Sequence, residues 1–430
     1  MKESIKKRIE AVRRGEVPEG YSAERAMLFP NDWGEPVALN IVLSENKDRN
    51  EDLRFGKEDV LSVSGEQGIV NQITLLGRSY AGESVAPYHV VETGDVVYTK
   101  SPLKENPYGI IKQNRGAPGI VSTLYAVYHC STPVTGQYLE NYFCIDTYLN
   151  NYLKPLVKRG AKNDMKVNNE EVLLGRIPLP SLKEQERINE IIAQFDRIIE
   201  LKQQLLEEKS RQKQWLMQTL LDPDSGVHLP GFETRVWKEI PLSEVFSYIR
   251  NGFVGTATPY YVDDGIPYIE GTNIQNGQWD LSEVLHISEE FHRKHPNSVL
   301  RTGDVVVVQS GHVGDCTVVT EKIDGSNSHA IIIMTPTPRV NPYFCACYIN
   351  SPIGQGRLVV CITGNTVKHI LASDMKKYLL PCPEKDEQDA LANLFCAAEK
   401  EITAIEKEID AWKQKKKALM QLLLTGLVRV

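Results

Sequence analysis

The sequence predicts an α+β fold in which two α/β domains are separated by two long antiparallel coiled-coil helices, with a pseudo-twofold internal duplication. Three observations predict this fold. Two segments rich in short β-branched runs each lead into about forty residues without proline or glycine, a length typical of a long helix. These two helical segments repeat the same residues at a constant spacing. The second of them also carries a heptad of mostly apolar positions.

Composition is that of a soluble protein. The chain has 430 residues, of which 41% are hydrophobic and 24% are charged, enough for two or three domains. It contains no apolar run of about 18 residues and no apolar leader at its N-terminus, so we expect a cytoplasmic protein without a membrane span. The formal net charge of −7 disfavours uniform coating of nucleic acid, but a local basic face would still allow DNA binding.

The eight cysteines are expected to be reduced thiols, as in other cytoplasmic proteins. None of them forms a Cys-x-x-Cys pair. Cys345 and Cys347 lie two residues apart in an apolar stretch, which favours a place in the core over a zinc site.

The first half of the chain divides into an arm and a domain. Residues 1–20 are predicted to form an N-terminal helix or arm, with Ile5, Ile9 and Val12 on its apolar side. Residues 21–176 are predicted to form the first α/β domain. Its expected elements are strands at 37–42, 60–63, 89–91, 96–99 and 120–127, and helical structure at 137–156.

The second half repeats this order after a long helix. Residues 177–222 are predicted to form the central helix, which ends at a Pro- and Gly-containing turn. A linker at 223–236 leads to the second α/β domain at 237–380, and residues 381–430 form the distal helix. The strands expected in the second domain lie at 267–270, 305–309, 316–320 and 330–334.

The duplication is clearest in the helices, where the two copies match without a gap at a spacing of 203 positions. The first copy contributes Pro178, Pro180, Glu184, Gln185, Leu216, Met217, Gln218, Leu220 and Leu221. The second contributes Pro381, Pro383, Glu387, Gln388, Leu419, Met420, Gln421, Leu423 and Leu424. Between the domains, Trp33 matches Trp237 and Thr93–Val97 matches Thr302–Val306, with little else aligned.

An apolar seam predicts that the two long helices pair with each other. The distal seam comprises Ala398, Ile402, Ile405, Ile409, Trp412, Lys416, Leu419 and Leu423, spaced alternately four and three residues apart. The partner-facing residues expected on the central helix are Ile188, Phe195, Ile199, Leu206 and Leu216. Because Lys202, Lys209 and Lys213 fall on the equivalent seam, we expect the pairing surface of the central helix to be rotated or partly polar.

Antiparallel pairing of helices of about 40 residues, roughly 60 Å long, would put one domain at each end of a rod, related by a pseudo-twofold axis. Duplex DNA has the same twofold symmetry, and dimeric DNA readers use it to place two reading heads on spaced half-sites. Because the two domains differ in sequence, their half-sites are expected to differ too.

Several motifs resemble the specificity (S) subunits of type I restriction-modification enzymes. They include the Pro-x-Pro-x-x-x-Glu-Gln entry to each long helix, the Gly-Asp-Val-Val strands and the C-terminal Leu-Leu-Thr-Gly-Leu-Val-Arg-Val. Pro230-Gly231-Phe232, Trp237 and Tyr268–Ile274 are similar as well. The resemblance covers nearly the whole chain, and a minor departure is Cys382, where the first copy has Leu179.

The resemblance implies two target-recognition domains that read a bipartite, asymmetric DNA site and no catalytic activity in this chain. It implies that the helices dock two methyltransferase (M) subunits, joined by restriction (R) subunits. No cofactor is expected on this chain, since S-adenosylmethionine, ATP and Mg²⁺ would bind the partner subunits. The alternative within the same class is the specificity subunit of a type IIB enzyme, in which one partner chain fuses methylation and cleavage.

Signals for chemistry in this chain are weak. Asn106-Pro107-Tyr108 and Asn341-Pro342-Tyr343 resemble the Asn-Pro-Pro-Tyr loop of adenine methyltransferases but lack its second proline, and a turn is the simpler interpretation. No phosphate-binding Gly-x-x-x-x-Gly-Lys motif occurs. A stand-alone methyltransferase or nuclease, and a purely structural scaffold, remain as alternatives from other classes. The repeated Glu-Gln pair is expected to cap each helix and to touch the neighbouring domain.

Candidate DNA contacts are polar loop residues, because Arg, Lys, Asn and Gln read base edges and phosphates take cations and hydroxyls. In the first domain they are Lys47, Arg49, Arg54, Arg78, Tyr80, Lys112 and Arg115. In the second domain they are Arg250, Asn251, Thr256, Thr258, Asn273, Gln275, Arg293, Lys294, Gln309, Ser310, His312, Asn327, His329, Asn365 and Lys368. Lys47, Arg250, Gln309 and His312 rank first because each lies at the edge of an expected strand. His312 and His329 lack the nearby cysteines or carboxylates that a metal site would need.

Overall fold

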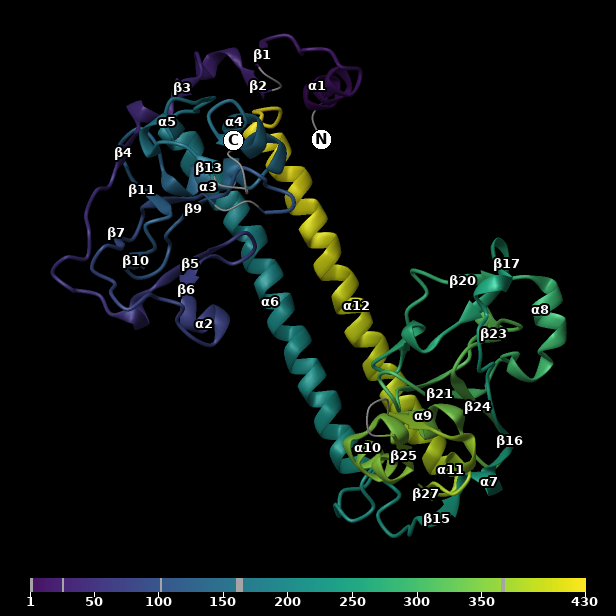
Figure 1. Cartoon of the computed structure of the whole chain (residues 1–430). Coiled ribbons are helices and arrows are strands. Elements are labelled where there is room, and N and C mark those ends of the chain that lie inside the picture. Colours follow the sequence, from purple (N-terminus) through teal and green to yellow (C-terminus); the bar gives the residue numbers. More distant parts are fainter. Residues whose placement is uncertain (1–2, 25–26, 101–102, 160–164, 365–367) are drawn as a thin grey trace. The chain divides into compact units, whose positions relative to one another are not determined.

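A computed structural model of the chain describes residues 3–24, 27–100, 103–159, 165–364 and 368–430. It is a mixed helix and strand fold with two long helices, α6 (Leu182–Leu220) and α12 (Lys385–Leu424), which confirms the predicted α+β class (Figure 1). The chain forms two compact units: unit 1 comprises residues 1–201 and 409–430, and unit 2 comprises residues 202–408. Because this division runs through both long helices, it does not decide the domain boundaries predicted from the sequence, which stay predictions.

Unit 1 begins with a short helix and a hairpin and continues into a strand-rich region. Besides its parts of α6 and α12, its elements are α1 (Glu3–Arg13), β1 (Tyr21–Glu24), β2 (Met27–Pro30), β3 (Val37–Ala38), β4 (Leu43–Glu45), β5 (Leu61–Ser64), β6 (Gly68–Asn71), α2 (Gln72–Leu76), β7 (His89–Val91), β8 (Val96–Thr99), β9 (Ile111–Gln113), β10 (Gly119–Val121), β11 (Tyr125–Cys130), α3 (Gly136–Phe143), α4 (Asp146–Leu153), β12 (Lys158–Arg159), β13 (Met165–Lys166), α5 (Asn169–Val172) and β14 (Arg176–Ile177).

Unit 2 holds the second strand-rich region. Besides its parts of α6 and α12, its elements are β15 (Lys238–Pro241), α7 (Leu242–Val245), β16 (Phe246–Asn251), β17 (Tyr261–Ile269), β18 (Ile274–Gln275), β19 (Gln278–Trp279), β20 (Leu285–Ile287), α8 (Glu289–Lys294), β21 (Val305–Val308), β22 (Cys316–Val318), β23 (Asn327–Ser328), β24 (Ile331–Pro336), α9 (Pro342–Asn350), α10 (Pro352–Leu358), β25 (Ile362–Thr363), β26 (His369–Ile370), α11 (Ala372–Met375) and β27 (Leu379–Cys382).

Each unit is built on a four-stranded antiparallel sheet of the same strand order. The order is β4-β11-β8-β9 in unit 1 and β16-β24-β21-β22 in unit 2. In both sheets, the third strand of this order, β8 or β21, follows the repeated Thr-Gly-Asp sequence, and we call it the central strand. A helix packs against the last strand: α3 against β9 in unit 1, and α9 against β22 in unit 2. The duplication seen in the helices therefore extends to the sheets, although their sequences have diverged.

The repeated Thr-Gly-Asp sequence closes the turn that starts each central strand. The carboxylate of Asp95 accepts a hydrogen bond from the backbone N–H of Glu92 at 2.9 Å, and Asp304 accepts one from Arg301 at 3.1 Å. The glycine before each aspartate has a positive φ, 97° at Gly94 and 89° at Gly303, which a side chain would strain. Glycine and aspartate are thus needed for the turn, and the valines after them are buried in the sheet.

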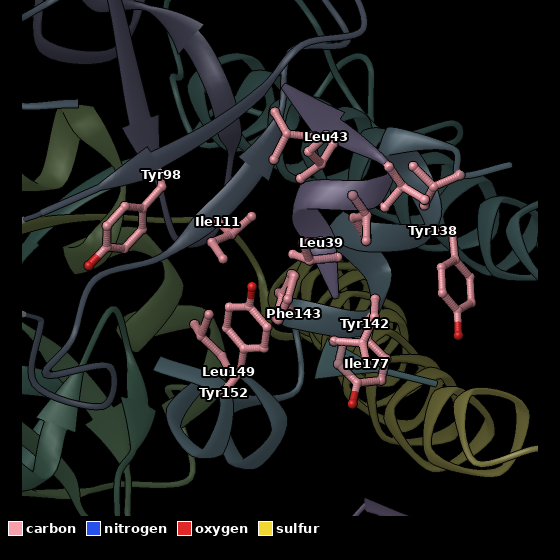
Figure 2. Packing of buried hydrophobic residues seen from close by; sticks show 14 of the residues in the cluster. Leu39, Leu43, Tyr98, Ile111, Tyr138, Tyr142, Phe143, Leu149, Tyr152 and Ile177 are labelled. Atoms are coloured by element: carbon pink, nitrogen blue, oxygen red, sulfur yellow. The ribbon is translucent and has the colours of Figure 1, made fainter. Parts of the chain in front are cut away.

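The ends of the long helices are part of the core of each unit. In unit 1, Ile188 and Ile192 of α6 and Leu423 of α12 belong to the cluster that also contains the aromatic side chains of α3 and α4. Figure 2 shows this cluster around Tyr142, Phe143 and Tyr152, and the Phe143 and Tyr152 rings pack edge to face with centroids 4.9 Å apart. The corresponding cluster of unit 2 includes Leu220, Leu221, Leu391, Ala392 and Phe395.

The repeated glutamine fixes the start of each long helix to its own unit. Gln185 is fully buried; its Oε1 accepts from the N–H of Thr135 at 3.0 Å, and its Nε2 donates to the carbonyls of Pro133 and Pro180. Gln388 repeats the pattern, accepting from the N–H of Asn341 at 2.8 Å and donating to the carbonyls of Arg339 and Pro383. The contact with the neighbouring domain is confirmed.

In each unit, the repeated glutamate accepts a hydrogen bond from the indole N–H of a tryptophan. Trp33 Nε1 donates to Glu184 at 3.1 Å, and Trp237 Nε1 donates to Glu387 at 3.0 Å. Arg429 near the C-terminus also binds Glu184, at 2.7 Å. The prediction that these side chains cap their own helices was wrong, because their hydrogen bonds go to distant segments. This also explains why the two tryptophans repeat with the helices.

Within each unit the two long helices pair antiparallel. In unit 1, Phe195 and Trp412 pack with ring centroids 5.5 Å apart, and Lys416 binds Asp196 at 2.5 Å. In unit 2 the seam lysines bind glutamates of α12 in reverse order. The pairs are Lys202 with Glu408, Lys209 with Glu401, and Lys213 with Glu399. The lysines therefore make the paired surface partly polar, as predicted. Ile402 and Ile405, on the apolar seam of α12, are buried.

Reversing the charge at the three lysines tests these ion pairs between α6 and α12. Changing Lys202, Lys209 and Lys213 to glutamate should lower the free energy of unfolding by about 1–3 kcal/mol in total, because exposed pairs contribute little each but like charges would now face one another. Added changes of Glu399, Glu401 and Glu408 to lysine should restore most of the loss. Urea unfolding of the parent, the triple variant and the sixfold variant measures both effects, and a triple Lys→Glu variant as stable as the parent would contradict the pairing.

Three expected elements differ from the structure. The strand expected at 37–42 is limited to β3, and a 3-10 helix at Leu39–Ile41 follows it. The run at 120–127 forms two strands, β10 and β11, because Ser122–Leu124 make a turn in which the N–H of Tyr125 bonds to the carbonyl of Ser122. The helical segment at 137–156 is split into α3 and α4 at Cys144-Ile145. Among the described residues, none of the helices combines the length and apolarity that a bilayer crossing requires.

Candidate nucleic-acid interface

In unit 2 the polar loops meet at one edge of the four-stranded sheet. Because β16, β24, β21 and β22 alternate in direction, the end of β16, the start of β24, the end of β21 and the start of β22 lie side by side. Loops 252–258, 309–315 and 328–330 therefore emerge together. We call this edge, with these loops, the reading edge of unit 2.

Backbone contacts fix these loops to one another. The N–H of Gln309 donates to the carbonyl of Ala330 at 3.2 Å, and Phe253 pairs with His329 as an isolated bridge. Ser310 pairs with His369 in the same way. His312 Nε2 lies 2.7 Å from the carbonyl of Ile274 and so ties in the hairpin of β18 and β19. The edge is a connected surface and not a set of independent loops.

Many of the predicted contacts of unit 2 lie on or beside this edge. Asn251, Thr256, Thr258, Gln275 and His312 are exposed there, and Ser310 is partly exposed. His329 is partly buried and bonds to the hydroxyl of Tyr268 at 3.0 Å through Nδ1. This surface combines amides, hydroxyls and imidazoles, the groups that hydrogen-bond to base edges and phosphates.

Unit 1 has an equivalent edge. The matching loops follow β4 and β8 and precede β11, because β4, β11 and β8 correspond to β16, β24 and β21. Lys47, Arg49 and Arg54 lie in the first of these loops and are exposed. We call the residues that follow β4 and β8 and precede β11 the reading edge of unit 1.

The cations of this edge are held in place by neighbours. Lys47 binds Glu170 at 3.1 Å, and Arg54 binds Glu92 at 3.1 Å while lying over the ring of Phe55. Arg49 donates to the carbonyl of Pro87. Such exposed ion pairs are weak and can exchange for phosphate contacts.

The remaining candidates are scattered. Arg78 and Tyr80 are exposed and stacked, with the guanidinium 4.6 Å from the ring centroid. Arg293 and Lys294 are exposed at the end of α8, and Lys368 is exposed beside β26. Asn365 lies outside the described residues.

Four predicted contacts have structural roles instead. Lys112 lies in β9 and not in a loop; it is buried and pairs with Glu140. Arg115 binds the same carboxylate at 2.8 Å. Asn273 and Asn327 are buried, and their amides donate to carbonyls within unit 2. These four side chains have partners within the fold, and their contacts with DNA stay predictions.

Arg250 also belongs to the fold. Its guanidinium donates to the carbonyls of Asn297 and Val299, and it lies 3.6 Å from Asp304, whose pKa is raised by burial. These contacts give Arg250 a structural role, and its ranking among the first DNA contacts stays a prediction. The matching aspartate of unit 1, Asp95, is instead held by His129 at 2.5 Å.

Arg250→Ala should therefore lower the free energy of unfolding by about 2–4 kcal/mol, because it leaves a buried carboxylate without its cation. At a temperature where the variant is folded, base preference should be unchanged. Urea unfolding and competition binding measure the two effects, with Lys322→Ala as an exposed control. If the variant has normal stability but has lost its base preference, Arg250 contacts DNA and does not stabilise the fold.

One residue of the unit 1 edge, Lys100, and one residue beside it, His89, were missed. Lys100 follows β8 at the position that Gln309 has after β21, and the repeated Thr-Gly-Asp sequence could have located it. His89 is buried; burial first, then the charges of Arg49 and Lys100, lower its pKa to about 4. Arg49 also pairs with His89 as an isolated bridge, so these two residues lie side by side.

The residue types that a catalytic or metal site would use have other surroundings in the described part of the chain. Among the described residues, no group of three or more His, Cys, Asp or Glu is arranged to hold a metal ion. All eight cysteines are free thiols, and burial raises the pKa of Cys130 and Cys347 to about 12, which makes their thiols poor nucleophiles. Asn106 and Asn341 of the two Asn-Pro-Tyr sequences bind Asp146 and Asp389 within the fold.

Known proteins share the sequence pattern. Residues 123–208 match the family model described as type I restriction modification DNA specificity domain. The chain is 23% identical over 432 residues to the putative type I restriction enzyme MjaX specificity subunit of Methanocaldococcus jannaschii, covering 97% of this chain and 95% of that protein. It is 25% identical over 257 residues to the type I restriction enzyme EcoBI specificity subunit of Escherichia coli, covering 54% and 53%.

Solved structures share the fold. A chain from a study of complex assembly and conformational transition in a type I R-M system aligns with a TM-score of 0.54 at 18% identity, covering 96% of this chain and 98% of that chain. The type I restriction-modification S subunit from M. genitalium aligns with a TM-score of 0.53 at 12% identity, covering 91% and 95%. In sequence pattern and in fold, this chain is therefore similar to the specificity subunits of type I restriction-modification systems.

Proposed function

We propose that this chain is the DNA-recognition subunit of a type I restriction-modification enzyme, with one reading edge in each unit. The observation that carries the proposal is the repeated edge: two sheets of the same order present loops of different sequence. A repeated frame with different loops suits a bipartite site with unlike half-sites. The chain itself performs no catalytic step.

The long helices serve as a spacer and as a docking surface for two M subunits, which R subunits then join. Trp215 of α6 is 56% exposed and Leu205 is 42% exposed, although they lie on a helix that pairs with α12. Large exposed side chains on such a helix favour a further protein contact. S-adenosylmethionine, ATP and Mg²⁺ bind the partner subunits in this proposal.

The test is DNA binding by the chain in complex with its partner subunits. Mapping of methylated adenines in the host genome, with and without this gene, gives both half-sites and the gap. Labelled duplexes with that site should then bind at least about a thousandfold more tightly than scrambled duplexes, the low end for specific DNA binding. Affinity should fall steeply with salt, because phosphate contacts release counterions. Equal binding to both duplexes would overturn the proposal.

A further inference from the structure

Lys100 and Gln309 occupy the same position in the two units. Residues 93–100 and 302–309 align residue for residue from the repeated Thr-Gly-Asp turn through the central strand. Thr99 pairs with Tyr125 in unit 1, and Val308 pairs with Ile331 in unit 2. Each of the two residues is therefore the first to leave the central strand at its reading edge.

The backbone holds both positions firmly. Gln309 donates its N–H to Ala330 and accepts the N–H of Ile370 at 3.0 Å, so it lies between two neighbouring segments. Next to Lys100, the N–H of Thr99 donates to the carbonyl of Ile110 at 2.9 Å, and its hydroxyl accepts the N–H of Ile110. Side chains on such fixed backbone start from a defined place, which base reading requires.

The polar end of the Gln309 side chain is poorly satisfied within the protein. Gln309 is 8% exposed, and within the described part of the chain its buried Oε1 accepts no hydrogen bond. Burial lowers the pKa of Lys100. Buried polar groups are normally hydrogen-bonded, so a buried amide oxygen without a donor at a functional edge indicates a missing ligand.

The neighbours of Lys100 and of Gln309 differ in charge. Near Lys100 lie Arg49 and the buried imidazole of His89, whose Nδ1 makes no hydrogen bond to any described residue. Near Gln309 lie Ser310 and the partly buried His329, which are neutral or weakly basic groups. The unit 1 position thus combines the cations of Lys100 and Arg49 with the carboxylate of Glu45, which raises the pKa of Lys100 against the effect of burial, and the unit 2 position offers both donors and acceptors.

We propose that Lys100 and Gln309 are the specificity-determining residues of the two reading edges, with Lys100 contacting a guanine and Gln309 contacting an adenine in the major groove. Lysine donates to the O6 and N7 acceptors of guanine. A glutamine amide donates to N7 of adenine and accepts from its N6 amino group, which would occupy the unpaired Oε1. This inference rests on the proposed function.

The experiment uses the full complex and duplexes that carry the methylation-mapped site. Each guanine and adenine of the site is replaced in turn by its 7-deaza analogue, which removes the N7 acceptor. For the parent complex, one 7-deazaguanine in one half-site and one 7-deazaadenine in the other should weaken binding about tenfold, the lower part of the range for a good contact.

The variants assign these losses to residues. In Lys100→Met, the 7-deazaguanine penalty should disappear while the 7-deazaadenine penalty remains, and in Gln309→Leu the reverse should hold, because neither new side chain can donate to N7. Lys154→Met and Gln194→Leu, which make the same side-chain changes at exposed positions away from the edges, should keep both penalties. Circular dichroism checks that each variant is folded.

Two outcomes overturn the inference separately from the proposed function. If the variants keep both penalties, other residues read the bases although the complex still selects its bipartite site. If either variant loses binding to matched and scrambled duplexes alike, its side chain acts on the backbone and not on a base. Absence of any site preference in the parent complex would instead sink the proposed function.

Discussion

Gln185→Ala is expected to lower the free energy of unfolding of unit 1 by about 2–4 kcal/mol, and Gln388→Ala should do the same in unit 2. Each glutamine satisfies one backbone N–H and two carbonyls from segments far apart in the sequence. Both side chains are buried, so alanine leaves three polar groups without water and a small cavity.

Thermal and urea unfolding of the two single variants and the double variant measure this effect. Gln194→Ala is the matched control, because Gln194 is exposed on the same helix and alanine favours helix there. The two losses should be additive, since each glutamine acts within its own unit. If Gln185→Ala is as stable as Gln194→Ala, the glutamine does not anchor the helix.

Regular elements were predictable from the sequence because their signals are local. The absence of proline and glycine and the apolar periodicity place the central helix at about the bounds that α6 has, Leu182–Leu220. Strands β7 and β8 coincide with runs of β-branched residues. The split between β10 and β11 was missed because Ser122–Leu124 lack the glycine or proline that marks most turns.

Side-chain roles were less predictable because they depend on partners far away in the chain. Arg250 and Lys112 look like surface cations until their buried carboxylate partners, Asp304 and Glu140, are known. The Glu-Gln pair looks like a helix cap for the same reason. The reading edges could have been found by aligning Thr93–Lys100 with Thr302–Gln309, but only the sheet order shows which loops they join.

Insertion of heptads into both long helices is expected to lengthen the gap between the two DNA half-sites. The division between units crosses α6 after Leu201 and α12 after Glu408, so insertion at both points leaves the helix contacts within each unit intact. A heptad also keeps the apolar seam in phase. Seven residues add about 10.5 Å of helix, or about three base pairs of DNA.

The helical twist of DNA adds a second expectation, because a longer gap also rotates one half-site relative to the other. Three added base pairs turn the second half-site by about 100° around the DNA axis, because the duplex repeats about every 10.5 base pairs. One heptad should therefore bind its longer site weakly. Three heptads add about 31 Å, close to nine base pairs and nearly a full turn, and should bind more tightly than one.

Selection from a library of duplexes with all gap lengths measures the preferred gap of each variant. A heptad inserted into α6 alone is the control, since it shifts the seam against α12 and should reduce folding as well as binding. A preferred gap that stays fixed in the folded three-heptad variant would show that the helices do not set the spacing. The two edges would then have to be held by the partner subunits, and the duplicated helices would serve for docking alone.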